Sequence, residues 1–211
     1  MRTLTKELQA DITPAKAIEL LKEGNKRFIN NLKVNRNLFQ QVNETSDGQH
    51  PLAVILSCID SRTSAELIFD QGLGDIFSVR IAGNILNEDI LGSMEFACKV
   101  AGSKLVVVLG HSKCGAIKGA CDGVEMGNLT TLLSKVKPAI EAEKTITVQR
   151  NASNGEFVEK VAELNVKLTM HEILERSSIL KDMVVSGEIK IIGGMYDVGT
   201  GVVDFYDEEK L

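Results

Sequence analysis

The sequence has no tryptophan, only three prolines and three histidines, and few aromatic residues, which make up 4% of its 211 residues. It also has no low-complexity tract. With 44% hydrophobic and 25% charged residues, the composition excludes a disordered or fibrous chain, because both classes have strongly biased compositions. A chain of this length can form a full hydrophobic core, so we expect one folded domain.

An excess of basic charge is missing as well. The chain has 24 Lys and Arg against 29 Asp and Glu, which gives a net charge of -5, and this balance argues against a nucleic-acid partner. No apolar run approaches the roughly 20 residues that cross a bilayer. The first residues, 1–11, mix charges in a way that is untypical of a signal peptide. We therefore expect a cytoplasmic protein with no membrane partner.

The four cysteines are Cys58, Cys98, Cys114 and Cys121. Without an export signal, a disulfide framework is not expected, and thiol or thiolate chemistry is the better interpretation. Cys98 and Cys121 lie in predicted helices, where a free cysteine is usually a small packed hydrophobe. The other two cysteines are therefore the candidates for chemistry.

Short apolar runs alternate with helical segments along the middle of the chain. The run at 52–57 is continuously apolar, as in a strand that is buried on both faces. Because parallel strands need a crossover connection, the alternation predicts an α/β fold with a mostly parallel four-stranded sheet, an additional edge strand and helices on both faces. The predicted strands are 52–57, 76–81, 104–109 and 189–192, with helices at 65–69 and 89–101 and the edge strand at 202–206.

Further helices are predicted before and after these strands. Thr13 followed by Pro14 is typical of a helix start and predicts a helix over 14–30, whereas the polar segment 31–50 reads as a connecting arm. Long amphipathic helices are predicted over 129–143 and 156–177. The expected organisation is one domain, with an N-terminal helical arm over 1–50, an α/β core over 51–206 and a charged tail over 207–211.

Three potential metal ligands follow two of the predicted strands. Cys58 comes directly after the strand at 52–57, and His111 and Cys114 follow the strand at 104–109. Ligands of open parallel sheets collect outside the carboxyl ends of the strands, so the three side chains meet if these strands are neighbours. Two thiolates and one imidazole match the preference of zinc, and a set of three leaves one coordination position open, as in catalytic sites. The sequence therefore predicts a catalytic centre with one Zn²⁺ per chain.

Asp60 and Arg62 stand close to Cys58 in the sequence. A zinc ion lowers the pKa of its bound water to roughly 7 and so supplies hydroxide as a nucleophile at neutral pH. Asp60 can reach the same ion, and Arg62 can hold its carboxylate by two charge-assisted hydrogen bonds. We hypothesise a switch, in which Asp60 on Arg62 leaves the zinc open to water and Asp60 on the zinc, the closed form, blocks it.

The pattern Cys58-x-Asp60-x-Arg62 with His111-x-x-Cys114-Gly115 resembles that of the β-class carbonic anhydrases. The resemblance implies a zinc enzyme, built as a dimer or tetramer, that converts carbon dioxide and water into bicarbonate and a proton through zinc-bound hydroxide. It covers most of residues 14–206 and includes the segments GQHP at 48–51, FDQGLGD at 69–75, VRIAGN at 79–84 and GMYD at 194–197.

The resemblance also assigns roles to individual residues. It implies that the zinc ligands are Cys58, His111 and Cys114 and that Asp60 and Arg62 form the catalytic pair. Among the remaining matches, Gln49 corresponds to a glutamine that hydrogen-bonds substrate from the partner subunit, Gly115 to a backbone N–H that meets a substrate oxygen, and Phe77 and Phe96 to the lining of the substrate pocket.

Some members of that family bind bicarbonate at a second, inhibitory site that includes a tryptophan, an arginine and a tyrosine. In this sequence Ile55 occupies the tryptophan position, and Arg80 and Tyr196 are the residues that could stand for the other two. We expect this regulatory site to be absent or weak.

Two alternatives compete with carbon dioxide hydration. The first is a related zinc hydrolase that acts on carbonyl sulfide or carbon disulfide, because those linear molecules need the same nucleophile. The second is a non-catalytic zinc or thiol binding protein, although the chain has no Cys-x-x-Cys pair, which counts against thiol redox chemistry.

Overall fold

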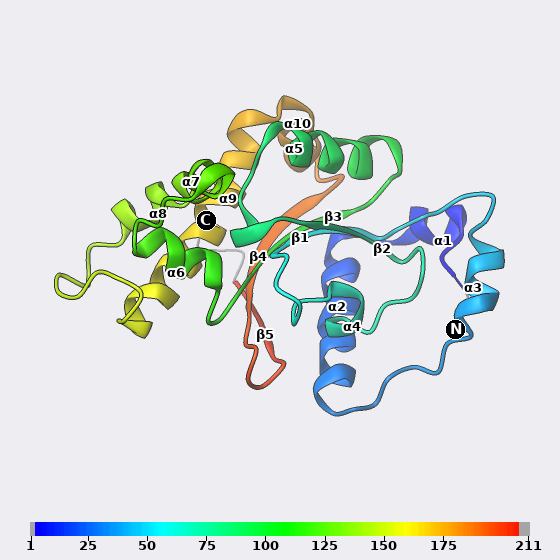
Figure 1. Cartoon of the computed structure of the whole chain (residues 1–211). Coiled ribbons are helices and arrows are strands. Elements are labelled where there is room, and N and C mark those ends of the chain that lie inside the picture. The colour runs from blue at the N-terminus through cyan, green and yellow to red at the C-terminus, as the bar shows by residue number, and fades with distance from the viewer. Residues whose placement is uncertain (1–2, 207–211) are drawn as a thin grey trace.

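A computed structural model describes residues 3–206, and the expected tail over 207–211 lies outside them. A five-stranded sheet with the order β2-β1-β3-β4-β5 forms the centre of the molecule (Figure 1). The first four strands in this order are parallel, and the short β5 runs antiparallel to β4. The predicted fold class is thereby confirmed. The strands are β1 (Ala53–Ser57), β2 (Ile76–Arg80), β3 (Leu105–His111), β4 (Lys190–Tyr196) and β5 (Val203–Phe205).

The two central strands, β1 and β3, are buried along their whole length. Successive side chains point to opposite faces of a strand, so each strand contributes to two cores. Ile55 and Val107 belong to the core on one face, with the helices α2 (Pro14–Ile29) and α4 (Ala65–Ile68). Figure 1 shows these helices on the side of the sheet opposite to α5 and α10.

The second core lies on the opposite face and contains Val54 and Val108. It is covered by α5 (Glu88–Glu95), α9 (Gly155–Arg176) and α10 (Ser178–Val185). The prediction of helices on both faces is therefore confirmed. The sequences of β1 and β3 are continuously apolar because both faces of each strand are buried, as inferred from the sequence.

The segment 31–50 differs from the prediction of a plain connecting arm. It contains the helix α3 (Leu38–Glu44), which Asn37 caps by accepting a hydrogen bond from the Gln40 N–H at 3.0 Å. Gln41 on this helix is buried, and its Oε1 accepts a hydrogen bond from the Leu73 N–H at 3.2 Å. The segment is therefore a packed element, not a free connection.

The predicted helix over 129–143 is also wrong as a single element. It is divided into α7 (Gly127–Ser134) and α8 (Lys137–Ala142), and Pro138 lies in the first turn of α8. A proline has no N–H to donate to the preceding turn, and its ring restricts the residue before it, which explains the interruption. The predicted helix over 156–177 is present as α9, which Asn154 caps.

The remaining helical elements are short. The predicted helix over 89–101 consists of α5 followed directly by one π-helical segment, η2 (Phe96–Val100). None of the helices in the described range 3–206 is long and apolar enough to cross a membrane. The elements not yet given are α1 (Lys6–Asp11), η1 (Ala82–Asn84) and α6 (Gly115–Cys121).

Candidate metal centre

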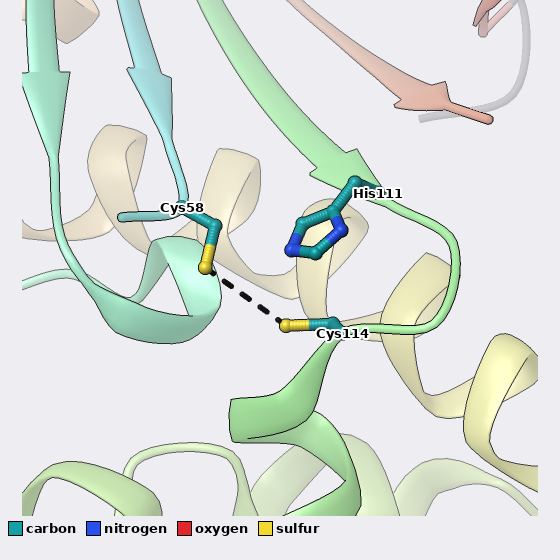
Figure 2. Close-up of side chains that lie close together, drawn as sticks. All are labelled: Cys58, His111 and Cys114. Atoms are coloured by element: carbon teal, nitrogen blue, oxygen red, sulfur yellow. Dashed lines mark hydrogen bonds between the residues drawn. The ribbon is translucent and has the colours of Figure 1, made fainter. Parts of the chain in front are cut away.

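Cys58, His111 and Cys114 meet at the carboxyl edge of the sheet. Cys58 follows β1 directly and His111 is the last residue of β3, and these strands are parallel neighbours with Ser57 opposite Leu109. Cys114 is the N-cap residue of α6. One potential ligand atom from each residue lies within 4.8 Å of the others. The sequence predicted that these three side chains meet if the two strands are neighbours, and the structure brings them together, as Figure 2 shows.

A left-handed turn returns the chain from β3 to α6. Lys113 has a φ of 57°, and its N–H donates to Glu159 Oε1 on α9 at 2.8 Å. The Ser112 N–H donates to the Tyr196 carbonyl of β4 at 2.9 Å. These contacts hold the turn against two neighbouring elements, so that Cys114 is directed back towards Cys58.

The two thiols interact directly and lie 4.0 Å apart, Sγ to Sγ. Both are buried, with 3% of Cys58 and 1% of Cys114 exposed. The hydrogen bond from the Cys114 thiol lowers the pKa of Cys58 below its ordinary value, and the Gly83 N–H adds to this effect. The pKa of Cys114 is raised, because the neighbouring Cys58 and burial both disfavour a second negative charge. Both residues can be thiolates at this distance only if a cation compensates their negative charges.

His111 completes the donor set. Its Nδ1 lies 3.0 Å from the Ser112 carbonyl. Because a carbonyl oxygen only accepts hydrogen bonds, this contact assigns the proton to Nδ1. The buried Nε2 has no hydrogen-bond partner. A buried acceptor without a partner is costly. The 4.0 Å between the sulfurs is close to the edge of about 3.8 Å that two zinc–sulfur bonds of about 2.3 Å span in a tetrahedron. The residues therefore fit a zinc ion in donor type and in spacing.

Asp60 is held by Arg62 and not by the three potential ligands. Arg62 Nε donates to Asp60 Oδ1 at 2.9 Å, Nη2 donates to Oδ2 at 2.8 Å, and the Arg62 N–H donates to Oδ1 at 3.0 Å. These bonds hold the pKa of Asp60 well below its usual range. Of the two arrangements considered from the sequence, this is the one that leaves the metal position free.

Two side chains fasten the loop that carries Cys58 and Asp60. Thr63 Oγ1 lies 3.0 Å from the Cys58 carbonyl and 2.9 Å from the Asp60 carbonyl. Arg80 at the end of β2 reaches the same two oxygens, with Nε at 3.0 Å and Nη2 at 2.7 Å. Sequence reasoning missed Thr63 entirely and considered Arg80 only for an inhibitory site. In the structure Arg80 binds the main chain of the loop.

Gly115 lies directly beside this centre, as the first residue of α6. The N–H groups in the first turn of a helix have no partner within the helix. A Cβ placed on Gly115 would meet no atom within 4 Å, so the space beside it is open. As the first residue of α6, Gly115 has an N–H with no acceptor inside the helix.

Three of the predicted substrate-binding residues lie away from the metal centre of their own chain, namely Gln49, Phe77 and Phe96. Gln49 is exposed near the amino end of β1, where it lines a hollow with Thr45. Phe77 and Phe96 pack edge to face, with ring centroids 6.3 Å apart, and line a different hollow beside α5. Neither hollow includes any of the three potential ligands.

Comparisons with known proteins agree with this geometry. The family described as carbonic anhydrase matches residues 53–203. Carbonic anhydrase 2 of Mycobacterium tuberculosis is 35% identical over 196 residues, which cover 89% of this chain and 90% of that protein.

Two solved structures show the same likeness in three dimensions. The β-carbonic anhydrase CafA of Aspergillus fumigatus has a TM-score of 0.68 at 28% identity, covering 80% of this chain and 81% of that one. A tetrameric β-carbonic anhydrase of Sordaria macrospora has a TM-score of 0.67 at 25% identity, covering 90% of this chain and 94% of that one.

Proposed function

The chain belongs to the β-class carbonic anhydrase family, and we propose that it catalyses the reversible hydration of carbon dioxide to bicarbonate and a proton at a zinc centre. The observation that carries this function is the buried group of Cys58, His111 and Cys114, whose potential ligand atoms lie within 4.8 Å of one another. These three residues would hold the zinc ion. When bound, zinc supplies a Lewis acid that makes water nucleophilic at neutral pH.

The side chains around the centre exclude bulk water. Cys58 and Cys114 belong to an apolar cluster that includes Ile85, Ile117 and Phe157. Hydrogen bonds and interactions between charges are stronger in such surroundings, because little solvent screens them. An apolar wall also suits carbon dioxide, which carries no net charge.

Asp60 and Gly115 would orient the reactants. The Asp60 carboxylate stays ionised because Arg62 holds it, and its remaining lone pairs can accept a hydrogen bond from water. The Gly115 N–H, beside open space at the start of α6, can donate to an oxygen of carbon dioxide or bicarbonate. The two groups together would hold nucleophile and substrate in a reactive arrangement.

The first experiment is stopped-flow hydration of carbon dioxide at alkaline pH on protein of known zinc content. We expect zinc at about one per chain and rapid hydration in the wild type, and loss of both in Cys114→Ser. Cys98→Ser is the matched control, because Cys98 is equally buried, at 2% exposed, but lies in the second core. Zinc without hydration would contradict the proposal, and release of sulfide from carbonyl sulfide would then identify the alternative hydrolase.

We further propose that a second copy of the chain completes the substrate site. Gln49, Phe77 and Phe96 lie in hollows away from the centre of their own chain, whereas the family resemblance gives all three a role at the substrate. A partner chain can supply them if the hollows face the partner's centre. The tetrameric relative of Sordaria macrospora supports self-association.

Mixed assemblies test this arrangement. Cys114→Ser and Gln49→Ala chains would each be inactive or weakly active alone. If Gln49 serves the partner, then a dimer of one chain of each kind contains one intact site, and a random mixture recovers about a quarter of wild-type activity. No recovery after verified subunit exchange would contradict the proposal that Gln49 serves the centre of the partner chain.

A further inference from the structure

Asn165 is a buried polar side chain on α9 to which the mechanism above gives no part. Only 4% of it is exposed, and its neighbours Val161, Ala162 and Val166 on the helix are also buried. A buried amide is unfavourable unless it forms hydrogen bonds. Asn165 Nδ2 donates to the Gly83 carbonyl at 2.9 Å, across 82 residues of sequence.

Gly83 lies in the short turn η1 (Ala82–Asn84) that follows β2. It has a φ of 71°, and the next residue, Asn84, has a φ of 42°. Two successive left-handed residues are unusual, since few residue types other than glycine and asparagine adopt this conformation readily. Such a backbone needs contacts from its surroundings to keep it in place. The bond from Asn165 is one of these contacts.

The turn directs the Gly83 N–H at the sulfur of Cys58, with the nitrogen 3.3 Å from Sγ. A donor at this position stabilises the thiolate and fixes the direction of its remaining lone pairs. Hydrogen bonds to metal-ligating atoms control the charge that these atoms give to the metal, and their loss typically lowers metal affinity or activity by roughly 10- to 100-fold.

We propose that Asn165 is a positioning residue of the metal centre, which holds the Gly83 turn so that the Gly83 N–H donates to the sulfur of Cys58. The proposal rests on the zinc function given above. It extends that function to α9, a helix that contributes none of the three ligands. Asn165 acts through the main chain of Gly83, and it touches neither metal nor substrate.

A purely structural role would have different consequences. If Asn165 only satisfied the Gly83 carbonyl, its replacement would lower the stability of the whole fold and leave the Cys58 sulfur unchanged. If it positions the turn, then the Gly83 N–H moves away from the sulfur, and the bond between them weakens in a chain that is still folded.

The bond can be observed directly in protein loaded with ¹¹³Cd²⁺ in place of zinc. Scalar coupling between the Gly83 amide proton and the cadmium, transmitted through the Cys58 sulfur, reports the N–H···S hydrogen bond. Asn165→Leu removes the donor at similar volume, and Asn165→Ala removes it without adding bulk. Thr169→Val is the matched control, because Thr169 lies one turn further along α9 and is equally buried, at 4% exposed.

We expect the coupling in the wild type and in Thr169→Val, and its loss in both Asn165 variants. Cadmium affinity, measured by competition with a chelator, is expected to fall by roughly 10- to 100-fold in the Asn165 variants alone. Absence of the coupling in the wild type, or unchanged coupling and affinity in Asn165→Ala, would overturn the inference.

The same samples separate this inference from the proposed function. A wild-type chain that binds cadmium but hydrates no carbon dioxide fails the function and still gives a valid coupling measurement. A wild-type chain that binds neither cadmium nor zinc would overturn the metal centre, and the role of Asn165 with it.

Discussion

At the scale of single residues, hydrogen bonds fix the main-chain carbonyl oxygens of Cys58 and Asp60 in addition to their side chains. Thr63 and Arg80 both reach these two carbonyls. The sequence identified Cys58 and Asp60 because thiolate and carboxylate are chemically distinctive residue types. It gave no indication of Thr63, because donation to a carbonyl is open to any hydroxyl and depends on the fold of the loop.

We predict that Thr63→Val lowers the free energy of unfolding by about 1 kcal/mol, the usual net contribution of one hydrogen bond. Hydration is expected to slow several-fold, because the loop that carries Cys58 and Asp60 loses one of its two supports. Denaturant unfolding and stopped-flow rates measure the two effects. Thr63→Ser keeps the hydroxyl and should behave like the wild type. A Thr63→Val protein with the stability and the hydration rate of the wild type would contradict the role of the hydroxyl.

At the scale of secondary-structure elements, the sequence predicted what depends on local patterns. The strands β1 and β3 were recognisable because burial on both faces demands a continuous apolar run. The helix α3 was not, since its buried residue is the polar Gln41 and its start is set by the Asn37 cap. The division between α7 and α8 could have been inferred from Pro138 alone.

Helix α2 packs against the end of α4 at a position where only glycine fits. A Cβ on Gly24 would lie 1.8 Å from the Phe69 carbonyl oxygen, and a main-chain atom cannot move aside alone. We predict that Gly24→Ala destabilises the fold by about 1–3 kcal/mol, the usual cost of overpacking, as measured by denaturant unfolding.

Gly155→Ala is the control for this substitution. Gly155 begins α9, and a Cβ there would meet no atom within 4 Å, so alanine is expected to be neutral or slightly stabilising. A Gly24→Ala protein as stable as the wild type would mean that α2 can shift away from α4 at little cost.

At the scale of the whole molecule, the centre joins elements that are remote in sequence. Its three residues come from the end of β1, the end of β3 and the start of α6. The rule for the carboxyl edge of parallel sheets predicted their meeting on the condition that β1 and β3 are neighbours, a pairing that the structure supplies. It could not place Gln49 or the Phe77–Phe96 pair, which line hollows that include none of the three potential ligands.

Removal of the metal should therefore lower the stability of the entire fold. Free zinc at a hundred times its dissociation constant adds about 2.7 kcal/mol to the free energy of unfolding. We expect a chelator to lower the thermal midpoint of the wild type and to leave that of Cys114→Ser unchanged. An identical midpoint with and without chelator would show that the centre binds no ion in the folded protein.

The parallel pairing of β1 with β3 also has a consequence for the order of folding. Cys58 and Cys114 are 56 residues apart in sequence. They come together only after the connection between β1 and β3, which includes β2 and α5, has folded. Such non-local contacts form slowly, and no short segment of the chain contains all three ligands. We therefore expect a zinc ion to bind only after these strands have paired, so that it would slow unfolding more than it would speed folding.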